Sequence, residues 1–262
     1  MTEVRVGVVI PTLNSAGTLR TALLSVTQQA GCSATVVVAD SGSTDGTLDI
    51  CTAYGSKVLY VPPGNMYAAI NHGVRNLPCS WIAYLNSDDF VYSNTYERLV
   101  NEGVHSEADV VYGRGDYVDS HGRFLYSLSS PRPQDLSQLF KAQFFPFMPH
   151  AAVFRKEVFD ELGGFDETFR HIADMEFFGR ACFAGKRFAL VEGASVAAFR
   201  IHATQLSARE STVVMTEKAQ LRTRWNHGNA IAKSLALTKW KITNAHQYLL
   251  RWLRTGSLRR PQ

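Results

Sequence analysis

The sequence predicts an α/β protein with a mostly parallel central sheet flanked by helices and a basic helical extension at the C-terminal end. Over the first 85 residues, short β-branched apolar runs alternate with segments of helical periodicity, which is typical of βαβ units. The last 45 residues contain ten basic residues and no acidic one. With 262 residues, 45% of them hydrophobic, the chain can form one large domain or two small ones around a substantial core.

Four buried strands are expected in the first half, because each is a short apolar run that ends at Pro, Asp or Asn. They span residues 4–10, 34–39, 57–61 and 80–85. Helices are expected between them at 15–30, 47–54 and 66–75. In the first of these, apolar side chains recur at helical spacing at Leu19, Ala22, Leu23 and Val26.

The second half has shorter elements. Strands are expected at 110–112, 117–118, 151–154 and 195–201, and helices at 156–162 and 174–185. Helical patterns fill most of 210–253. We therefore divide the chain into a catalytic domain at 1–209 (with halves 1–100 and 101–209) and a basic helical extension at 210–262.

The net charge of +4 is the sum of a charge of −6 on the body, residues 1–217, and a charge of +10 on the tail, residues 218–262. Such asymmetry indicates contact with a polyanion. Ile242, Ala245, Leu249, Trp252 and Leu253 share one helical face, and a basic helix with such a face can lie in a membrane interface. The alternatives are packing on the catalytic domain or homodimerisation, and nucleic acid is disfavoured.

The four cysteines are scattered, with no C-x-x-C pair, which favours reduced thiols over a metal cluster or disulfide framework. No signal peptide or membrane-spanning segment is expected. The predicted location is cytoplasmic, with contact at the inner face of the cytoplasmic membrane as a further expectation.

Polar residues follow each strand of the first half. They include Asn14, the loop from Asp40 to Asp45, Asn65 and the pair Asp88-Asp89. Because ligands of open α/β sheets bind at the carboxyl ends of the strands, these residues are candidates for a ligand site. Adjacent carboxylates repel each other, and Mg²⁺ or Mn²⁺ relieves that repulsion. The alternative for Asp88-Asp89 is a solvated helix cap.

Several segments together resemble family 2 glycosyltransferases of the GT-A (Rossmann-like) fold. They are VVIPTLNSAGTLRTALLSV, VVVADSGSTDGTLDI, GNMYAAINHG, WIAYLNSDDF, MPHAAVFRKEVFDELGGFDETF, HIADMEFFGRA and FRIHATQLS. The resemblance covers roughly residues 4–207. It implies inverting, metal-dependent transfer of a sugar from a UDP-, GDP- or dTDP-type donor to an acceptor hydroxyl, in lipopolysaccharide, exopolysaccharide or glycolipid synthesis. Expected partners are the nucleotide sugar and a glycan or lipid-linked acceptor.

The resemblance also implies residue roles in the donor site. Pro11, Thr12 and Asn14 would line the nucleotide pocket. Asp40 would accept a hydrogen bond from the base, with Asp45 in the same loop. The stretch containing Asn65, Met66 and Asn71 would cover the ribose and the donor sugar.

In the metal site, the resemblance implies that Asp89 binds the cation and that Asp88 contacts the ribose or supports the metal. Asp174 would be the catalytic base, and His202 would lie near the diphosphate.

Asp174 and Glu176 compete for the role of base, and they point about 200° apart on a helix. Asp174 is also a credible helix cap, and Glu176 can pair with Arg180 four residues on. His150 either borders the acceptor site or is a structural histidine.

Two departures from the family pattern are Ala68, where many relatives have Asp, and the segment 77–79 before the fourth strand. The alternative function is a non-catalytic nucleotide-sugar-binding or scaffold protein of the same fold, which the intact Asp88, Asp89 and Asp174 disfavour. A sugar-1-phosphate nucleotidyltransferase would need a basic Gly-rich loop after the first strand, which residues 11–14 do not provide.

Overall fold

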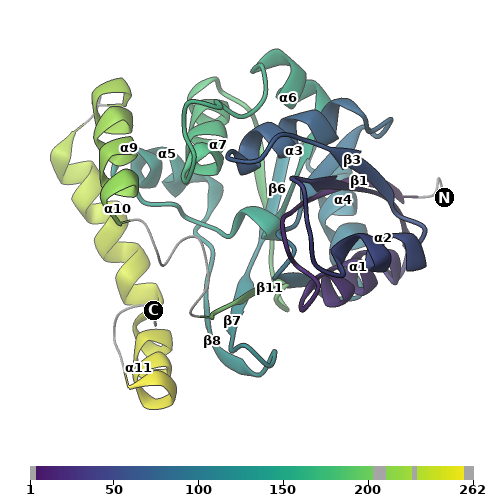
Figure 1. Cartoon of the computed structure of the whole chain (residues 1–262). Coiled ribbons are helices and arrows are strands. Elements are labelled where there is room, and N and C mark those ends of the chain that lie inside the picture. The colour runs from purple at the N-terminus through teal and green to yellow at the C-terminus, as the bar shows by residue number, and fades with distance from the viewer. Residues whose placement is uncertain (1–3, 203–210, 226–228, 257–262) are drawn as a thin grey trace.

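The computed structural model describes residues 4–202, 211–225 and 229–256 (Figure 1). A seven-stranded sheet is covered by helices on both faces, and a four-stranded sheet adjoins it. Helices from the C-terminal part of the chain form a further layer on one side.

The first half contains the elements expected there and two more. In chain order they are β1 (Val4–Thr12), α1 (Leu19–Thr27), β2 (Cys32–Asp40), α2 (Thr47–Ala53), β3 (Lys57–Tyr60), α3 (Met66–Arg75), β4 (Trp81–Tyr84), β5 (Phe90–Val91) and α4 (Thr95–His105). Helix α4 was not expected. Its buried side chains, Tyr96, Leu99 and Val100, do recur at helical spacing. Gly103 weakens that pattern, but a Cβ there would lie 2.4 Å from the Trp81 ring.

The second half contains more strands than expected. Its elements are β6 (Val110–Gly113), β7 (Gly115–Val118), β8 (Phe124–Leu128), α5 (Pro133–Lys141), a 3₁₀ turn (Pro149–Ala151), β9 (Ala152–Arg155), α6 (Lys156–Glu161), α7 (Ala173–Phe183), β10 (Phe188–Val191), β11 (Ala197–Arg200), α9 (Ser211–Arg224), α10 (Ala230–Thr243) and α11 (Ala245–Thr255). Strands β8 and β10 were not expected.

The large sheet has the order β10-β6-β9-β4-β1-β2-β3. Strand β9 runs antiparallel to β4 and β6, and the other neighbouring pairs are parallel, so the prediction of a mostly parallel sheet is confirmed. Thr12 pairs with Asp40, and Val9 pairs with Tyr84. This register brings the loops after β1, β2 and β4 to one edge of the sheet.

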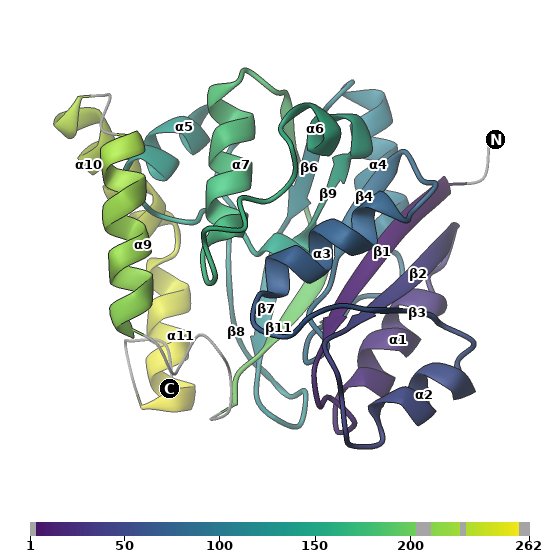
Figure 2. The ribbon, with the colours of Figure 1, turned by 45° about the horizontal axis from the view of Figure 1, so that its top comes forward.

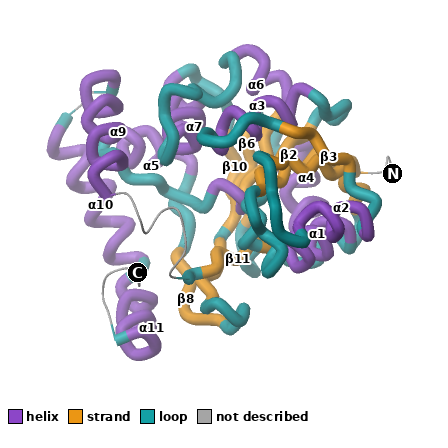
Figure 3. Tube along the Cα trace, viewed as in Figure 1, coloured by secondary structure: helices purple, strands orange, loops and turns teal. Residues whose placement is uncertain are grey.

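The smaller sheet has the order β5-β11-β7-β8 and was not predicted as a sheet. Figure 3 shows β8 and β11 extending away from the large sheet. Strand β11 pairs with both β5 and β7, and so brings the chain near residue 200 beside the loop that follows β4.

Two hydrophobic clusters lie on opposite faces of the large sheet. Val6, Val8 and Ile10 of β1 pack with α1 and α4, whereas Val9 packs with α3, α6 and α7, as strand alternation requires. Figure 2 shows α1 and α2 on the other side of the strands from α3. Helix α3 approaches β1 closely, because a Cβ at Gly73 would lie 2.5 Å from Val9.

The C-terminal helices α9, α10 and α11 pack against the body of the chain. Leu221 of α9 and Trp225 just after it are buried in the same cluster as α3 and α7. Trp240 of α10 packs against Phe144, and the guanidinium of Arg251 in α11 lies 5.3 Å from the ring of Tyr126. Part of the basic charge also faces the acidic body, since Lys239 pairs with Asp135 at 2.6 Å.

The expected apolar face of the tail is not buried against the catalytic domain. Ile242, Leu249, Trp252 and Leu253 are 49% to 71% exposed. The chain is divided at Asn244 into α10 and α11, so the five residues do not belong to one continuous helix. Within the described residues, no helix combines the length and apolarity needed to cross a bilayer.

Candidate active site

The loops after β1 and β2 are tied together by side-chain hydrogen bonds. Asn14 has a φ of 49°, a conformation that Asn tolerates better than most residues, and its Oδ1 accepts a hydrogen bond of 2.8 Å from the N–H of Thr44. The N–H of Asn14 donates to Oγ of Ser43 at 2.8 Å. Pro11 and Thr12 are buried at the end of β1, beside this junction.

Asp40 is fully buried at the end of β2. Its Oδ2 accepts hydrogen bonds from the N–H groups of Gly42 and Ser43 at 2.9 and 3.0 Å, and its Oδ1 accepts one from the Ser43 hydroxyl. The carboxylate thus organises its own loop. Contact between Asp40 and a nucleotide base stays a prediction.

Asp45 joins the same two loops. Its Oδ2 accepts a hydrogen bond from the N–H of Ala16 at 3.1 Å, and its Oδ1 accepts from the N–H and hydroxyl of Thr47. The hydroxyl of Thr47 is the main cause that holds the pKa of Asp45 below its ordinary value. The loop after β4 is attached through Ser15 and Ser87, whose hydroxyl oxygens lie 2.8 Å apart. Three strand ends therefore meet in one hydrogen-bonded surface.

Asp88 and His202 meet at this edge, although 114 residues separate them. Nε2 of His202 lies 2.9 Å from Oδ2 of Asp88, and both side chains are partly exposed. His202 follows β11, which the smaller sheet places beside the loop after β4. The sequence predicted both residues as site residues, and the structure brings them together.

Asp89 points away from solvent. Its side chain is 1% exposed, and Oδ1 accepts a hydrogen bond of 2.8 Å from the N–H of Arg200. Oδ2 accepts one of 3.1 Å from the side-chain amide of Asn86, and Nδ1 of the buried His150 lies 3.6 Å from it. This placement differs from the expectation that Asp89 reaches a metal. The burial of His150 favours its structural alternative.

Arg200 is a site residue that the sequence analysis missed. It is buried, and it donates hydrogen bonds of 2.8 Å from Nε to the carbonyl of Asp88 and from Nη1 to the carbonyl of Ser120. Buried charged groups are normally paired, so an Arg within the apolar strand AAFRI was an available signal. Arg200 holds the loop that presents Asp88.

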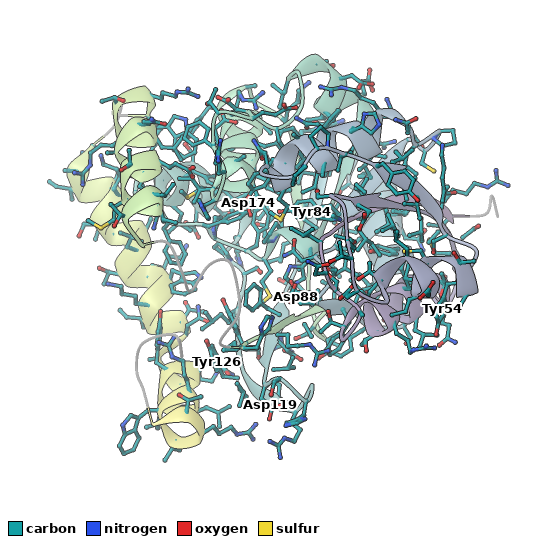
Figure 4. The ribbon with its side chains drawn as sticks, in the orientation of Figure 1. Tyr54, Tyr84, Asp88, Asp119, Tyr126 and Asp174 are labelled. Atoms are coloured by element: carbon teal, nitrogen blue, oxygen red, sulfur yellow. The ribbon has the colours of Figure 1, made fainter. Side chains whose placement is uncertain are left out.

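Asp174 lies in the first turn of α7 and faces the end of β4. Its Oδ2 accepts a hydrogen bond of 3.2 Å from the Tyr84 hydroxyl, and its Oδ1 accepts one of 2.7 Å from the N–H of Met175. Figure 4 shows Asp174 beside Tyr84, with Asp88 further along the same edge. Tyr67 and Tyr84 are buried and were predicted only as helix and strand residues.

The pKa of Asp174 is raised to about 6. Burial among aromatic side chains raises it, and hydrogen bonds from Met175, Tyr67 and Tyr84 oppose the rise. Burial prevails even though the start of a helix favours a negative charge. A carboxylate with this pKa can accept a proton near neutral pH.

Glu176 points to the other side of α7, as its spacing from Asp174 predicts. It is buried and forms a bidentate pair with Arg180, at 2.9 Å to Nε and 2.8 Å to Nη2. The predicted i,i+4 pair is thus confirmed. Arg180 also donates hydrogen bonds to the carbonyls of Leu162 and Gly164. These bonds fix the turn that follows α6.

Asn65, Met66 and Asn71 serve local structure. Asn65 caps α3 through a hydrogen bond from the N–H of Tyr67 at 2.9 Å, and Met66 packs against the core. Asn71 is 1% exposed, and its amide exchanges hydrogen bonds of 2.8 and 2.9 Å with the backbone of Phe165. Their contacts with a ribose or donor sugar remain predictions.

A mostly parallel sheet with carboxylates at its strand ends is the arrangement expected of the GT-A fold. The profile of the family described as glycosyl transferase family 2 matches residues 7–163, which is more than half of the chain. The chain therefore belongs to glycosyl transferase family 2.

Relatives from bacteria agree with this assignment. The PGL/p-HBAD biosynthesis glycosyltransferase of Mycobacterium tuberculosis is 32% identical over 187 residues, which cover 68% of this chain and 69% of that protein. Uncharacterized glycosyltransferases of Rickettsia bellii and Rickettsia typhi are 31% and 25% identical, over 47% and 66% of this chain. The chain spans only 19% and 57% of the lengths of these two proteins.

Solved structures share the fold. S. aureus TarS 1–349 in complex with UDP-GlcNAc aligns with a TM-score of 0.70 at 17% identity, over 92% of this chain and 73% of that one. Glucosyl-3-phosphoglycerate synthase of M. tuberculosis aligns with a TM-score of 0.59 at 16% identity, over 86% and 82%. At these identities the likeness extends to the fold alone.

Proposed function

We propose that the chain is an inverting, metal-dependent glycosyltransferase that moves a sugar from a nucleoside diphosphate donor to an acceptor hydroxyl. One observation carries the proposal: Tyr84 holds Asp174 at the end of β4, and the loop that follows β4 contains Asp88, which meets His202 from the end of β11. A proton acceptor and a candidate cation-binding pair thus share one edge of the sheet.

Asp174 is the proposed base. The acceptor oxygen attacks the anomeric carbon on the face opposite the diphosphate, and its proton passes to the carboxylate of Asp174. The bond between the anomeric carbon and the diphosphate oxygen breaks, and its electron pair leaves with the nucleoside diphosphate. Because the new bond forms opposite the old one, the configuration inverts.

The proposed metal ligands are Asp88 and His202. No cluster of three or more His, Cys, Asp or Glu suited to a metal occurs within the described ranges. Two protein ligands fit a cation of the Mg²⁺ or Mn²⁺ type, because such ions commonly take one or two carboxylates together with substrate phosphates. A bound cation would stabilise the charge on the departing diphosphate. We move this role from Asp89 to Asp88 because both oxygens of Asp89 are occupied in the interior.

A UDP-sugar is the first donor to test. TarS has been crystallised with UDP and with UDP-GlcNAc, which supports a donor of the uridine class for a chain of the same fold. The Mycobacterium tuberculosis relative that functions in PGL/p-HBAD biosynthesis supports a glycan or glycolipid product, in line with a role in bacterial cell-surface glycan synthesis.

The outer face of α10 and α11 is proposed to contact an anionic membrane. We define this face by its exposed side chains, Ile231, Leu235, Ile242, Leu249, Trp252 and Leu253. Residues 218–262 contain no acidic side chain, so a second copy would bring like charges together, whereas anionic lipids attract each basic residue by about 1 kcal/mol. A membrane also brings the enzyme to a lipid-linked acceptor at the inner face of the cytoplasmic membrane.

The decisive experiment measures thermal stability with UDP-, GDP- and dTDP-sugars, each with and without Mn²⁺, followed by assays of sugar transfer. We expect one donor class to raise the melting temperature in a Mn²⁺-dependent manner, because ligands that bind only the folded state stabilise it. Failure of every donor to stabilise the protein would contradict the proposal. Stabilisation without transfer to any acceptor preparation or to water would favour the non-catalytic alternative.

A further inference from the structure

Helix α9 places a buried carboxylate against the segment that precedes α7. The side chain of Glu217 is 5% exposed, and it accepts three backbone hydrogen bonds. Oε1 accepts from the N–H of Arg170 at 2.7 Å, and Oε2 accepts from those of His171 and Ile172 at 3.1 and 3.2 Å. A single side chain thus satisfies three successive N–H groups.

These N–H groups lie directly before the helix that carries Asp174. Ile172 is the N-cap of α7, and its own side chain offers no acceptor to the helix. The unpaired N–H groups at a helix start favour an anion, and a buried carboxylate is stable only when its lone pairs are occupied. The Glu217 carboxylate accepts hydrogen bonds from these N–H groups, so Glu217 and the start of α7 fix each other in position.

Two further side chains from the α9 region, Arg224 and Trp225, contact the same part of the molecule. Nη1 of Arg224, seven residues after Glu217, donates to Oδ2 of Asp166 at 2.8 Å, and its guanidinium lies 4.9 Å from the ring of Phe169. Trp225 packs on α7 at Gly179, where a Cβ would lie 2.5 Å from the indole. The segment from Asp166 to Ile172 is therefore held between α9 and the core.

A short route of contacts leads from Glu217 to Asp174. The carbonyl of His171, whose N–H is bound by Glu217, accepts a hydrogen bond of 3.1 Å from the Tyr67 hydroxyl. The same hydroxyl is also one of the groups that lower the pKa of Asp174. A displacement of the His171 peptide therefore moves a partner of Asp174 as well as the start of its helix.

We propose that Glu217 is a positioning residue for the reaction: from α9 it fixes the backbone of residues 170–172 and thereby the orientation of Asp174. The inference rests on the proposed role of Asp174 as base. It also assigns α9 to the catalytic machinery, although the sequence places this helix in the C-terminal extension.

The test compares Glu217→Gln and Glu217→Asp with Gln220→Ala, which changes an exposed residue of the same helix. In the full chain we measure kcat and donor KM for transfer, the acid limb of the pH profile, and amide hydrogen exchange in peptides covering 170–174. We expect Glu217→Gln to lower kcat by about tenfold to a hundredfold with an unchanged donor KM, because small displacements of a catalytic group have effects of this size. Exchange at residues 170–172 should rise at least tenfold, which follows from the loss of one or more hydrogen bonds.

Glu217→Asp keeps the charge on a shorter side chain and should recover part of kcat, while Gln220→Ala should match the wild type. A folded Glu217→Gln enzyme with wild-type kcat and an unmoved acid limb would overturn the inference. If Glu217→Gln does not fold, wild-type kcat and exchange in Glu217→Asp overturn it equally. Failure of the proposed function is distinguished by Asp174→Asn, since full transfer by that variant removes the base assignment itself.

Discussion

The hydroxyl of Tyr84 donates a hydrogen bond of 3.2 Å to Oδ2 of Asp174, and 90 residues separate the two along the chain. Tyr84 ends β4 and Asp174 lies in the first turn of α7, so the bond joins the strand-end loops of the first half to the proposed base of the second. It lies within a buried aromatic cluster that includes Phe165 and Phe177. That cluster raises the pKa of Asp174, and the tyrosine limits the rise.

The first prediction concerns the pH dependence of transfer. Because the pKa of Asp174 is about 6, kcat/KM should fall below this pH as the base is protonated. The groups that face Asp174 are Tyr67 from α3 and Tyr84 from β4. The charge of Glu217 in α9 contributes to raising the pKa of Tyr67. Asp174→Asn should lower kcat by about 10²-fold or more, the usual contribution of a general base. A steady-state pH profile measures both, and retention of kcat in Asp174→Asn would refute the assignment.

The carboxyl of Asp174 also makes the stability of the protein depend on pH. Transfer should increase as this group ionises, whereas stability should decrease. Its folded-state pKa lies above the unfolded value, so its contribution is present at low pH and is lost as pH rises from about 4 through 6. Asp174→Asn removes the buried charge and keeps an acceptor for Tyr84. We expect this variant to have a higher melting temperature than the wild type at pH 7.5 and an equal one at pH 4. A lower melting temperature at pH 7.5 would show that the ionised form is stabilised by folding.

The second prediction tests Tyr84. Tyr84→Phe removes a hydrogen bond that favours the ionised carboxylate, and such a bond contributes about 1.5 kcal/mol, equivalent to roughly one pKa unit. The acid limb of the pH profile should therefore move upward by about one. Tyr60→Phe, at an exposed position of β3, should leave it unchanged. An unmoved acid limb in Tyr84→Phe would separate this tyrosine from the titration of Asp174.

The third prediction separates Asp88 from Asp89. Asp88→Asn and His202→Ala should abolish the Mn²⁺-dependent part of stabilisation by the nucleotide sugar with little change in the stability of the unliganded protein, because both side chains are partly exposed. Asp89→Ala should instead destabilise the unliganded protein by about 1–3 kcal/mol, since it leaves the buried N–H of Arg200 without its acceptor. Denaturant titration and thermal shift together measure these effects. Loss of the Mn²⁺ effect in a stable Asp89→Ala protein would return the metal role to Asp89.

The fourth prediction concerns the turn before α7. Gly163 and Gly164 have φ values of 76° and 81°, but only Gly164 is crowded: a Cβ there would lie 2.8 Å from Oδ1 of Asn71. Gly163→Ala should lower the free energy of unfolding by about 1 kcal/mol, which is the strain of a left-handed residue. Gly164→Ala should lower it clearly more. Urea unfolding of the two variants is a matched comparison, because the backbone conformation is nearly the same. Equal losses would mean that Asn71 yields to the added methyl group.

The fifth prediction concerns the outer face of α10 and α11. Replacing Leu249, Trp252 and Leu253 with Ser should reduce binding to phosphatidylglycerol vesicles at least tenfold, because each exposed side chain would otherwise enter the apolar part of the interface. Val104→Ser, an exposed apolar residue of α4, is the control. Vesicle flotation and analytical ultracentrifugation should be run together. Binding unchanged by the triple substitution, or loss of a stable dimer instead, would contradict the membrane proposal.

Local patterns were sufficient for most of the first half. The helix expected at 66–75 is α3 with the same bounds, because Asn65 is a strong N-cap and the apolar spacing is regular. The ends of the strands expected at 4–10 and 34–39 were correct to within two residues. The second half was less predictable. Strand β9 is antiparallel and β11 pairs with β5 and β7, and such pairings depend on contacts between distant residues.

The sequence by itself determined that strand ends deliver Asn, Ser and Asp side chains to one edge of a sheet, and that Asp174 and Glu176 face opposite ways. Both follow from local geometry, namely the two-residue period of strands and the 100° step of helices. Only the tertiary structure decided that Asp88 faces outward beside His202 while Asp89 is buried under Arg200, because neighbouring residues of a loop have no fixed period. It likewise decided that Glu217 binds the start of α7 and that the apolar side chains on the outer face of α10 and α11 stay exposed. Burial is a property of the packed chain, since it depends on which distant segment covers each side chain.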